Sequence, residues 1–233
     1  MKKALVTGAA GFIGSHVVKQ LLDENVEVRA LVKPGEDEQN LNGLDIEKVQ
    51  GDVLDIGSLQ RAIKGCDTLF HLAAIYAIWM PDRQVIYDVN LKGSSNMLWT
   101  ALKADVEKVV YTSSIAAIGL KPGMEVSDES TPFNLIPVAN DYIMTKYLSQ
   151  ELALDFSKNG LPLVVVNPAF PFGEGDLVPT PTGQIIVEAL NPQIPIYMEG
   201  GFNMIDVKDV AQGHLLAAKK GRVGECYLLS NLN

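Results

Sequence analysis

The sequence feature that most constrains the fold is a set of three glycines that directly follows the first apolar run. Lys3–Thr7 is short and largely apolar, and Gly8, Gly11 and Gly14 lie where it passes into an amphipathic stretch over 12–23. In a strand–turn–helix unit, the first glycine permits a tight turn and the second lets backbone amides approach a pyrophosphate. The third lets the helix pack closely on the strand, and the N-terminus of that helix attracts anions. The pattern therefore predicts a dinucleotide-binding turn.

The rest of the chain alternates short β-branched runs with longer amphipathic stretches, without an internal repeat. Such alternation indicates a parallel sheet with right-handed crossovers and helices on both faces. Leu163–Val166 is apolar at every position, as a strand buried on both faces requires. We predict an α/β protein with a Rossmann doubly wound parallel sheet. Strands are expected at Lys3–Thr7, Val26–Val32, Ile46–Gln50, Thr68–Leu72, Lys108–Thr112, Leu163–Asn167 and Cys226–Leu229, and helices near 12–23, 58–64, 83–104, 141–158, 182–190 and 207–220.

From residue 168 the composition changes, because prolines and glycines become frequent and strand patterns rare. An irregular region of this kind suits the carboxyl edge of the sheet, where open α/β sheets bind ligands. We predict an NAD(P)-binding Rossmann domain over 1–167 and a smaller substrate-binding region over 168–233. Within the latter, 203–229 is expected to pack back on the Rossmann core.

Composition excludes several classes of function. The chain has 233 residues, of which 47% are hydrophobic, and a formal net charge of −9, which disfavours nucleic acid or an anionic membrane surface as partner. Two cysteines and three scattered histidines lack the spacing of a disulfide framework or a metal site, so no metal is expected. The longest apolar run, 69–80, is too short to span a membrane. Glycines interrupt the N-terminal apolar stretch that would otherwise imitate a signal peptide, so we expect a cytoplasmic protein without membrane insertion.

Further motifs follow the glycine turn in a fixed order. They are Thr7–Gly14, Gly51–Asp55, His71–Ala74, Asn90 within Val89–Gly93, Tyr111–Ser114, Tyr142-x-x-x-Lys146 and Asn167-Pro168. Together they resemble the extended short-chain dehydrogenase/reductase family, the NAD-dependent epimerase/dehydratase group, over the whole chain. Within this group, the chain is most similar to dihydroflavonol-reductase-like proteins and hopanoid-associated sugar epimerases, and the stretches 167–183 and 206–216 particularly resemble the latter. Because family members continue past the position equivalent to Asn233, we expect the substrate-binding region to be incomplete here.

The resemblance implies a bound nicotinamide dinucleotide. It places Asp52 and Val53 at the adenine, the backbone of Ala73 and Ala74 near the ribose and nicotinamide, and the segment 168–170 at the carboxamide. From the sequence alone, Asp52 could equally be a turn residue. The cofactor-binding residues expected are Gly8, Ala10, Gly11, Phe12, Ile13, Gly14, Arg29, Lys33, Asp52, Val53, Leu72, Ala73, Ala74, Thr112, Tyr142, Lys146, Asn167, Pro168 and Phe170.

The end of the second strand bears on which dinucleotide is bound. NAD enzymes usually place Asp or Glu there, where the carboxylate accepts hydrogen bonds from the ribose hydroxyls. This chain has Val32 at that position, Lys33 follows it, and Arg29 lies on the same strand face at period two. Two cations without a carboxylate suit a 2′-phosphate, which favours NADP, with NAD as the alternative. The cations could instead be solvated surface charges, and the acidic run 36–38 lies nearby.

Tyr142 and Lys146 are four residues apart, so they share one face of a helix. An ammonium group beside a phenol stabilises the phenolate, and it lowers the pKa toward working pH. We expect Lys146 also to bind the nicotinamide ribose. Ser114, just past a predicted strand, is expected to hydrogen-bond the reacting oxygen. The family resemblance favours it over Ser113, and its structural alternative is a turn serine.

The substrate is constrained mainly by what the sequence omits. Ser114 is followed by Ile115-Ala116 rather than the Asp-Glu pair of the family's dehydratases, and no Lys, Arg or His lies between Lys158 and Lys208. A nucleotide diphosphate would need cations in that stretch. Tyr76 and Trp79 are candidate substrate contacts, although ordinary core packing would also account for them. A small carbonyl compound, or a sugar without a nucleotide, is the expected substrate.

Three functions remain open at this point. The first is NADPH-dependent reduction of a ketone or aldehyde, with Tyr142 as proton donor. The second is a redox-neutral sugar epimerase, in which the same hydride returns to the other face of a transient ketone. The third is a non-catalytic dinucleotide sensor, against which the intact Ser114, Tyr142 and Lys146 argue. A homodimer through the helices near 83–104 and 141–158 is suggested only by analogy with family members.

Overall fold

The computed structural model describes residues 1–123, 125–191 and 201–231. The strands are β1 (Lys3–Thr7), β2 (Glu27–Val32), β3 (Glu47–Gln50), β4 (Thr68–His71), β5 (Lys108–Thr112), β6 (Leu163–Pro168), β7 (Phe170–Phe172), β8 (Met204–Asp206) and β9 (Cys226–Leu229). The α-helices are α1 (Phe12–Asp23), α2 (Ile56–Ile63), α3 (Arg83–Tyr87), α4 (Ser94–Lys103), α5 (Asp141–Lys158), α6 (Pro181–Ala189) and α7 (Val207–Lys220). Shorter helical turns are η1 (Gln39–Leu41), η2 (Asp88–Gly93), η3 (Ile115–Ala117) and η4 (Ile136–Val138).

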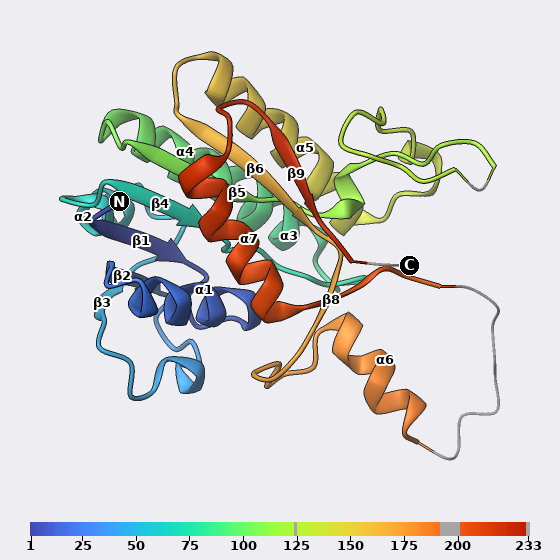
Figure 1. The fold of residues 1–233 in the computed structure, drawn as a ribbon, viewed down its shortest axis with the longest axis horizontal. Coiled ribbons are helices and arrows are strands. Elements are labelled where there is room, and N and C mark those ends of the chain that lie inside the picture. The colour runs from blue at the N-terminus through green and yellow to red at the C-terminus, as the bar shows by residue number, and fades with distance from the viewer. Residues whose placement is uncertain (124, 192–200, 232–233) are drawn as a thin grey trace.

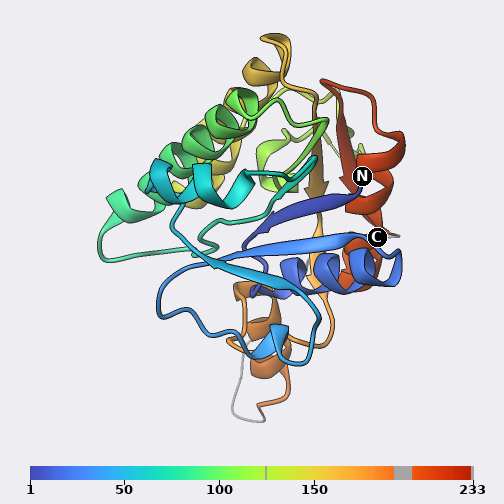
Figure 2. The same ribbon diagram turned by 90° about the vertical axis from the view of Figure 1, so that its left-hand side faces the viewer.

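A seven-stranded, all-parallel sheet in the order β3-β2-β1-β4-β5-β6-β9 forms the centre of the molecule (Figure 1). Helices α1 and α7 pack side by side on one face, whereas α2, α4 and α5 cover the other (Figure 2). The predicted doubly wound Rossmann sheet is therefore confirmed. The strand order reverses between β1 and β4, so the crevice outside their carboxyl ends is the expected place for a ligand.

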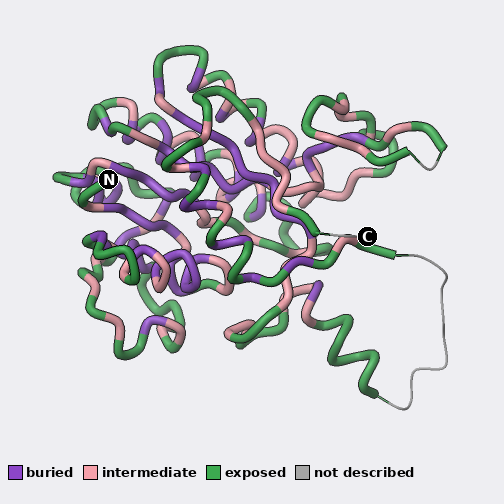
Figure 3. Tube along the Cα trace, in the orientation of Figure 1, coloured by how far each residue is buried: buried purple, intermediate pink, exposed green. Residues whose placement is uncertain are grey.

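The core follows from the alternation of side chains along the strands. On β1, Ala4 and Val6 face the α1 and α7 layer, whereas Leu5 between them faces α2, α4 and α5, and all three are fully buried. On β6, Leu163–Val166 is fully buried on both faces, as its sequence predicts. Figure 3 shows this buried band running through the sheet, with exposed loops around it.

A polar side chain caps the N-terminus of helix α5. The Asn140 side chain accepts a hydrogen bond from the backbone N–H of Ile143 at 2.9 Å, which satisfies a donor that the first turn leaves free. Asp141 occupies the first turn, where its negative charge suits the helix dipole. This cap fixes where the helix begins, and so sets Tyr142 in its first turn.

The stretch 83–104, predicted as one helix, is divided into α3, the π-helical turn η2 and α4. π-helical turns are rare and often occur at functional sites. Here the turn carries Asn90, whose amide binds both backbone groups of Ile75 and the hydroxyl of Thr145. The side chain therefore ties the loop after β4 to helix α5, a long-range contact that hydrophobic periodicity could not reveal.

Part of the C-terminal third of the chain lies against the main sheet. α7 packs on α1, and β9 pairs with β6 in parallel register. Strands β7 and β8, which the sequence did not predict, form a separate two-stranded parallel sheet. Each has only three residues, too few to show the period-two alternation by which a strand is recognised. Within the described residues, no helix is long and apolar enough to cross a membrane, and no cluster of three or more metal-ligating side chains occurs.

Candidate active site

A cleft of about 790 Å³ opens at the carboxyl edge of the sheet. It runs from the ends of β2 and β3, past the glycine turn after β1, to the start of α5 and the segments around β7 and α6. Most of the predicted residues are brought together in its lining. They are Gly8, Gly11, Phe12, Ile13, Gly14, Lys33, Asp52, Val53, Leu72, Ala73, Ala74, Tyr76, Thr112, Ser114, Tyr142, Lys146, Pro168 and Phe170.

The glycine turn has no room for a side chain at Gly8 or Gly14. Gly8 has φ +67°, and a Cβ on it would lie 2.8 Å from the backbone nitrogen of Ala73. A Cβ on Gly14 would lie 2.0 Å from the carbonyl oxygen of Gly8, so α1 can approach β1 only because that position is glycine. Gly11 is exposed to the cleft, and its own Cβ would be 3.2 Å from the same oxygen. The bare turn at the start of α1 therefore fits the pyrophosphate of a dinucleotide.

A buried hydrogen-bond chain beneath the cleft fixes the backbone of Ala73. The Ser94 hydroxyl donates to a backbone carbonyl at 2.7 Å, so it accepts from Nε2 of His71 at 3.1 Å. Burial lowers the pKa of His71 to about 3, so the ring is neutral and Nδ1 accepts from the Thr7 hydroxyl at 2.7 Å. Oγ1 of Thr7 in turn accepts from the N–H of Ala73 at 3.2 Å. The tautomer of His71 thus follows from its neighbours.

Three of the predicted polar residues converge in the middle of the cleft. The Ser114 hydroxyl accepts from the backbone N–H of Ala116 at 3.1 Å and is hydrogen-bonded with Tyr142. The Ser113 hydroxyl is also buried, but it has no hydrogen-bond partner among the described residues. On the next turn of α5, Nζ of Lys146 points to the same strand end and donates to the carbonyl of Thr112 at 3.1 Å. The arrangement places a hydroxyl, a phenol and an ammonium along one wall.

The phenol of Tyr142 has a raised pKa in this structure. Burial raises the pKa of Tyr142 well above its ordinary value, and the hydrogen bond with Ser114 only partly opposes that rise. The predicted lowering by Lys146 is not seen, because the ammonium is directed to the Thr112 carbonyl. Burial also lowers the pKa of Lys146, to about 8. At neutral pH, the phenol of Tyr142 is therefore protonated in this structure.

Helix α7 contributes a residue that the sequence did not single out. Nδ1 of His214 donates to the carbonyl of Val210 at 2.7 Å, which leaves Nε2 to accept from the Thr112 hydroxyl at 2.9 Å. Burial lowers the pKa of His214 to about 4, so this tautomer is neutral. Thr112 is thus held through its hydroxyl by α7 while its carbonyl accepts from Lys146.

Two predicted cofactor residues lie just outside the lining, where they support it. Asn167 is fully buried and donates to the carbonyl of Ser114 at 2.8 Å and to Gln150 at 2.6 Å, so it positions the strand end that carries Ser114. Ala10 is nearly buried, and its carbonyl accepts a hydrogen bond from the Asn40 side chain at 3.1 Å. Neither side chain faces the cleft directly.

At the other end of the cleft, Lys33 leaves β2 as predicted. Its ammonium lies 3.4 Å from Asp52 and its side chain is 63% exposed, so the pair is a weak surface contact. A hollow of about 400 Å³ adjoins the cleft here, and Arg61 lines it together with Lys33 and Asp55. Asp52 also accepts from the N–H of Leu54 at 2.9 Å, so it organises the turn as well as lining the cleft.

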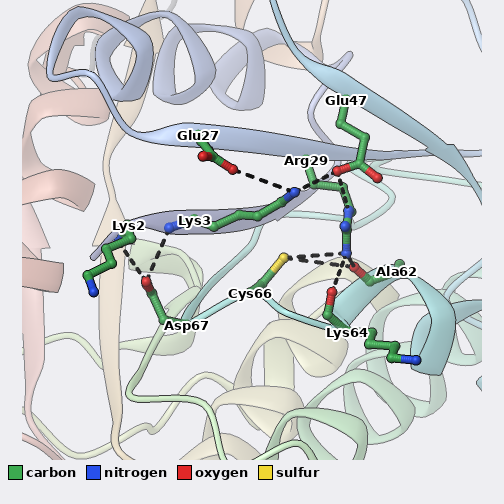
Figure 4. Close-up of polar contacts among 9 residues, drawn as sticks. All are labelled: Lys2, Lys3, Glu27, Arg29, Glu47, Ala62, Lys64, Cys66 and Asp67. Atoms are coloured by element: carbon green, nitrogen blue, oxygen red, sulfur yellow. Dashed lines mark hydrogen bonds and ion pairs between the residues drawn. The ribbon is translucent and has the colours of Figure 1, made fainter.

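Arg29 does not reach this end of the cleft, which corrects its assignment as a cofactor ligand. Its guanidinium lies 2.9 Å from Glu47 and donates to the carbonyls of Ala62 and Lys64 at 2.6 and 2.7 Å (Figure 4). Period two does place Arg29 and Lys33 on one strand face, but four residues separate them by about 13 Å along the strand. The guanidinium therefore belongs to a structural cluster near the amino ends of the strands.

The substrate side of the cleft is mostly apolar. Tyr76 packs its ring on that of Tyr142, with centroids 4.7 Å apart, and its hydroxyl lies 3.1 Å from that of Thr182. Trp79, the other predicted substrate contact, is 77% exposed and does not line the cleft, because the loop that carries it turns outward after Ile78. Other residues also line the cleft, although the sequence did not predict them as site residues. They are Leu31, Glu36, Gly51, Val85, Val89, Ser113, Ala116, Ile118, Leu120, Leu135, Asn140, Ile143, Pro171, Thr180 and Thr182.

A doubly wound parallel sheet with a bare glycine turn and a cleft at its switch point defines a Rossmann-type dinucleotide-binding protein. The sequence model of the NAD dependent epimerase/dehydratase family matches residues 4–230, so the chain belongs to that family and is an enzyme. The expected family resemblance is thereby confirmed.

Known proteins with similar sequences or structures include both reductases and epimerases. A Synechocystis protein named "Putative dihydroflavonol 4-reductase" is 43% identical over 232 residues, which are 98% of this chain and 67% of that protein. Sterol demethylase protein B of Methylococcus capsulatus is 34% identical over 226 residues, which are 97% of this chain and 69% of that protein. The crystal structure of a nucleoside-diphosphate-sugar epimerase from Pseudomonas aeruginosa has a TM-score of 0.87 at 28% identity, covering 100% of this chain and 73% of that one.

Proposed function

We propose that the protein is an NADPH-dependent reductase of a small, largely apolar ketone or aldehyde. The observation that best supports this function is the cleft, in which Ser114, Tyr142 and Lys146 lie between a glycine turn and an apolar pocket. Among the described lining residues, Lys33 and Lys146 are the only lysines or arginines, and Lys33 lies at the far, adenosine end. A substrate diphosphate would therefore find no cation on the substrate side of this lining.

The residues of the cleft suit reduction. A bound nicotinamide supplies a hydride to the carbonyl carbon, and the rest of the reaction belongs to the protein. Ser114 donates a hydrogen bond to the carbonyl oxygen and stabilises the charge that develops there. Tyr142, whose pKa is raised by burial, gives its proton to that oxygen as the alkoxide forms, and the phenolate regains a proton from water. Lys146, on the next turn of α5, binds the nicotinamide ribose in this proposal.

The adenosine end supports NADPH over NADH. Lys33 is exposed and only loosely paired with Asp52, and an exposed ion pair contributes roughly 0–1 kcal/mol. A doubly charged 2′-phosphate can therefore pair with the Lys33 ammonium in place of the Asp52 carboxylate with little loss of free energy. Arg61, which lines the adjoining hollow, supplies the second cation that Arg29 does not. Glu36 also lines the cleft, but its carboxylate accepts from the backbone N–H of Lys33 at 2.9 Å.

Two named relatives bear on the substrate. The Synechocystis relative carries a reductase name, and the Methylococcus relative carries the name of a sterol-modifying protein. Both names fit an apolar cleft better than they fit a sugar nucleotide. The structural likeness to a sugar epimerase keeps epimerisation as the second function to be tested.

The test is the loss of 340 nm absorbance from NADPH with a panel of aliphatic, aromatic and alicyclic carbonyl compounds. We expect stoichiometric oxidation of NADPH by apolar members of the panel. Tyr142→Phe should lower kcat by about 10²-fold or more, because a general acid contributes roughly that much. Tyr147→Phe is the matched control, since Tyr147 lies on the same helix but stacks on Phe133 outside the cleft. Isomerisation of a sugar without net consumption of NADPH would overturn the reductase assignment.

A further inference from the structure

One side-chain amide fastens the segment after β7 to the glycine turn. Asn40, in η1, donates through Nδ2 to the carbonyl of Ala10 at 3.1 Å and to the carbonyl of Gly175 at 3.0 Å. Ala10 belongs to the glycine turn, and Gly175 belongs to the loop 173–176 between β7 and α6. An amide nitrogen carries two hydrogens, and both are used here. The contact therefore requires Asn and is lost with Asp, whose oxygen would face two carbonyl oxygens.

The loop 173–176 is shaped for this contact. Gly175 has φ +90°, and a Cβ on it would lie 3.2 Å from Oδ1 of Asn40, so glycine is favoured both by conformation and by space. From α1, Nε2 of His16 donates to the carbonyl of Glu174 at 2.9 Å. From α7, the ammonium of Lys208 lies 3.1 Å from the Glu174 carboxylate. Contacts from three separate elements thus hold the loop beside the start of α1.

Both arms of this loop line the cleft. Pro168–Pro171 lies before it, and Thr180 and Thr182 lie after it. The Thr182 hydroxyl contacts that of Tyr76, whose ring packs on Tyr142. A shift of the loop would therefore move the substrate side of the cleft relative to the phenol.

We propose that Asn40 is a positioning residue that couples dinucleotide binding to the substrate side of the cleft. A dinucleotide on the glycine turn restrains Ala10, and Asn40 passes that restraint to the loop 173–176 and its two arms. Substrate then binds more tightly to the cofactor-loaded enzyme, and by linkage the cofactor binds more tightly when substrate is present. The inference rests on the proposed function for its substrate, but its main test needs only the cofactor.

The experiment is amide hydrogen exchange of peptides within 170–183, with and without saturating NADPH, in the wild type, Asn40→Asp and Asn40→Ala. In the wild type, NADPH should slow exchange in these peptides. In the two variants the added protection should fall by about three- to tenfold, the range expected for losing one or two hydrogen bonds. Asn40→Asp should show the larger loss, and Asn40→Ala keeps the test valid if the charged variant folds poorly. Gln39→Ala, an exposed neighbour, is the matched control and should behave as wild type.

A kinetic measurement separates positioning from general destabilisation. Asn40→Ala should raise the KM for the carbonyl substrate by a similar factor with little change in kcat, since Asn40 does not line the cleft. Equal protection by NADPH in the wild type and both variants would overturn the role of Asn40 alone. Failure of the wild type to bind either NADPH or NADH would instead overturn the proposed function.

Discussion

Replacing Gly14 by alanine tests the link between the glycine turn, the stability of the fold and cofactor binding. The new Cβ would lie 2.0 Å from the Gly8 carbonyl oxygen and 2.8 Å from its carbonyl carbon. An ordinary contact is about 3.5 Å, and the opposing atoms are backbone. Helix α1 must therefore retreat from β1 by roughly 1 Å or more.

The expected loss of stability depends on the apolar side chains that α1 buries against the sheet. Val17, Val18 and Leu21 are fully buried, and each contributes about 1.5–3 kcal/mol. A gap of 0.5–1 Å forfeits roughly a quarter to a half of the contact energy of packed atoms. We therefore expect Gly14→Ala to lower the free energy of unfolding by about 2–4 kcal/mol. The same retreat moves the start of α1 away from its ligand, so NADPH affinity should fall by about 10²-fold.

Urea unfolding and fluorescence titration with NADPH measure these two effects separately. Gly11→Ala is the matched control, because its Cβ would be 3.2 Å from the Gly8 oxygen and can be accommodated by a small shift. It should weaken NADPH binding, since it fills the exposed side of the turn, but change stability by less than about 1 kcal/mol. If Gly14→Ala kept wild-type stability and affinity, close approach of α1 to β1 would not require glycine at this position.

Further predictions concern charge and pH. Lys33→Ala should weaken NADPH binding about tenfold at unchanged stability. Arg29→Ala should instead lower the free energy of unfolding by about 2 kcal/mol at unchanged affinity, because two carbonyl groups lose their hydrogen-bond donor. The reverse pattern in NADPH titrations and urea curves would contradict the placement of Lys33 at the cofactor and of Arg29 in a structural cluster. Because the pKa of buried His214 is lowered to about 4, the unfolded chain binds a proton below about pH 6.5 that the folded chain does not. Stability should thus fall as pH drops from about 6.5 to 4, by about 3 kcal/mol from this group. His214→Gln should make the curve of urea midpoint against pH shallower by this contribution, while buried His71 keeps its own share of the slope. Burial lowers the pKa of Lys146 to about 8, so the ammonium is lost above that pH. NADPH affinity should decline there in titrations from pH 7 to 9.5, and Lys146→Arg should shift the decline upward; an affinity independent of pH would count against Lys146 as a ligand.

The sequence predicts the sheet well because its signals are local. Lys3–Thr7 and Lys108–Thr112 are strands with the predicted bounds, since each is a short β-branched or apolar run that ends at a turn. The stretch 83–104 was predicted as one helix because its apolar period continues across it. The π-helical turn within it forms where Asn90 reaches Ile75, a contact that sequence periodicity does not encode.

Most residues named by the motifs gather in the cleft, whereas the sequence carries no signal for contacts that depend on position along a strand or on tertiary packing. Arg29 shares a face with Lys33, but period two says nothing of position along the strand, and Glu47 on the next strand takes the guanidinium. His214 comes from an ordinary amphipathic helix, and only the packing of α7 brings it to Thr112.

We propose that the cleft holds a reduced nicotinamide dinucleotide whose hydride passes to a carbonyl carbon beside Tyr142. NADPH deuterated at C4 on the transferred face tests it most directly, with the alcohol product examined by mass spectrometry and NMR. We expect one deuterium at the former carbonyl carbon and one NADPH oxidised for each alcohol formed. NADPH oxidised without deuterium in the product, or a sugar isomerised while the dinucleotide keeps its label, would contradict it.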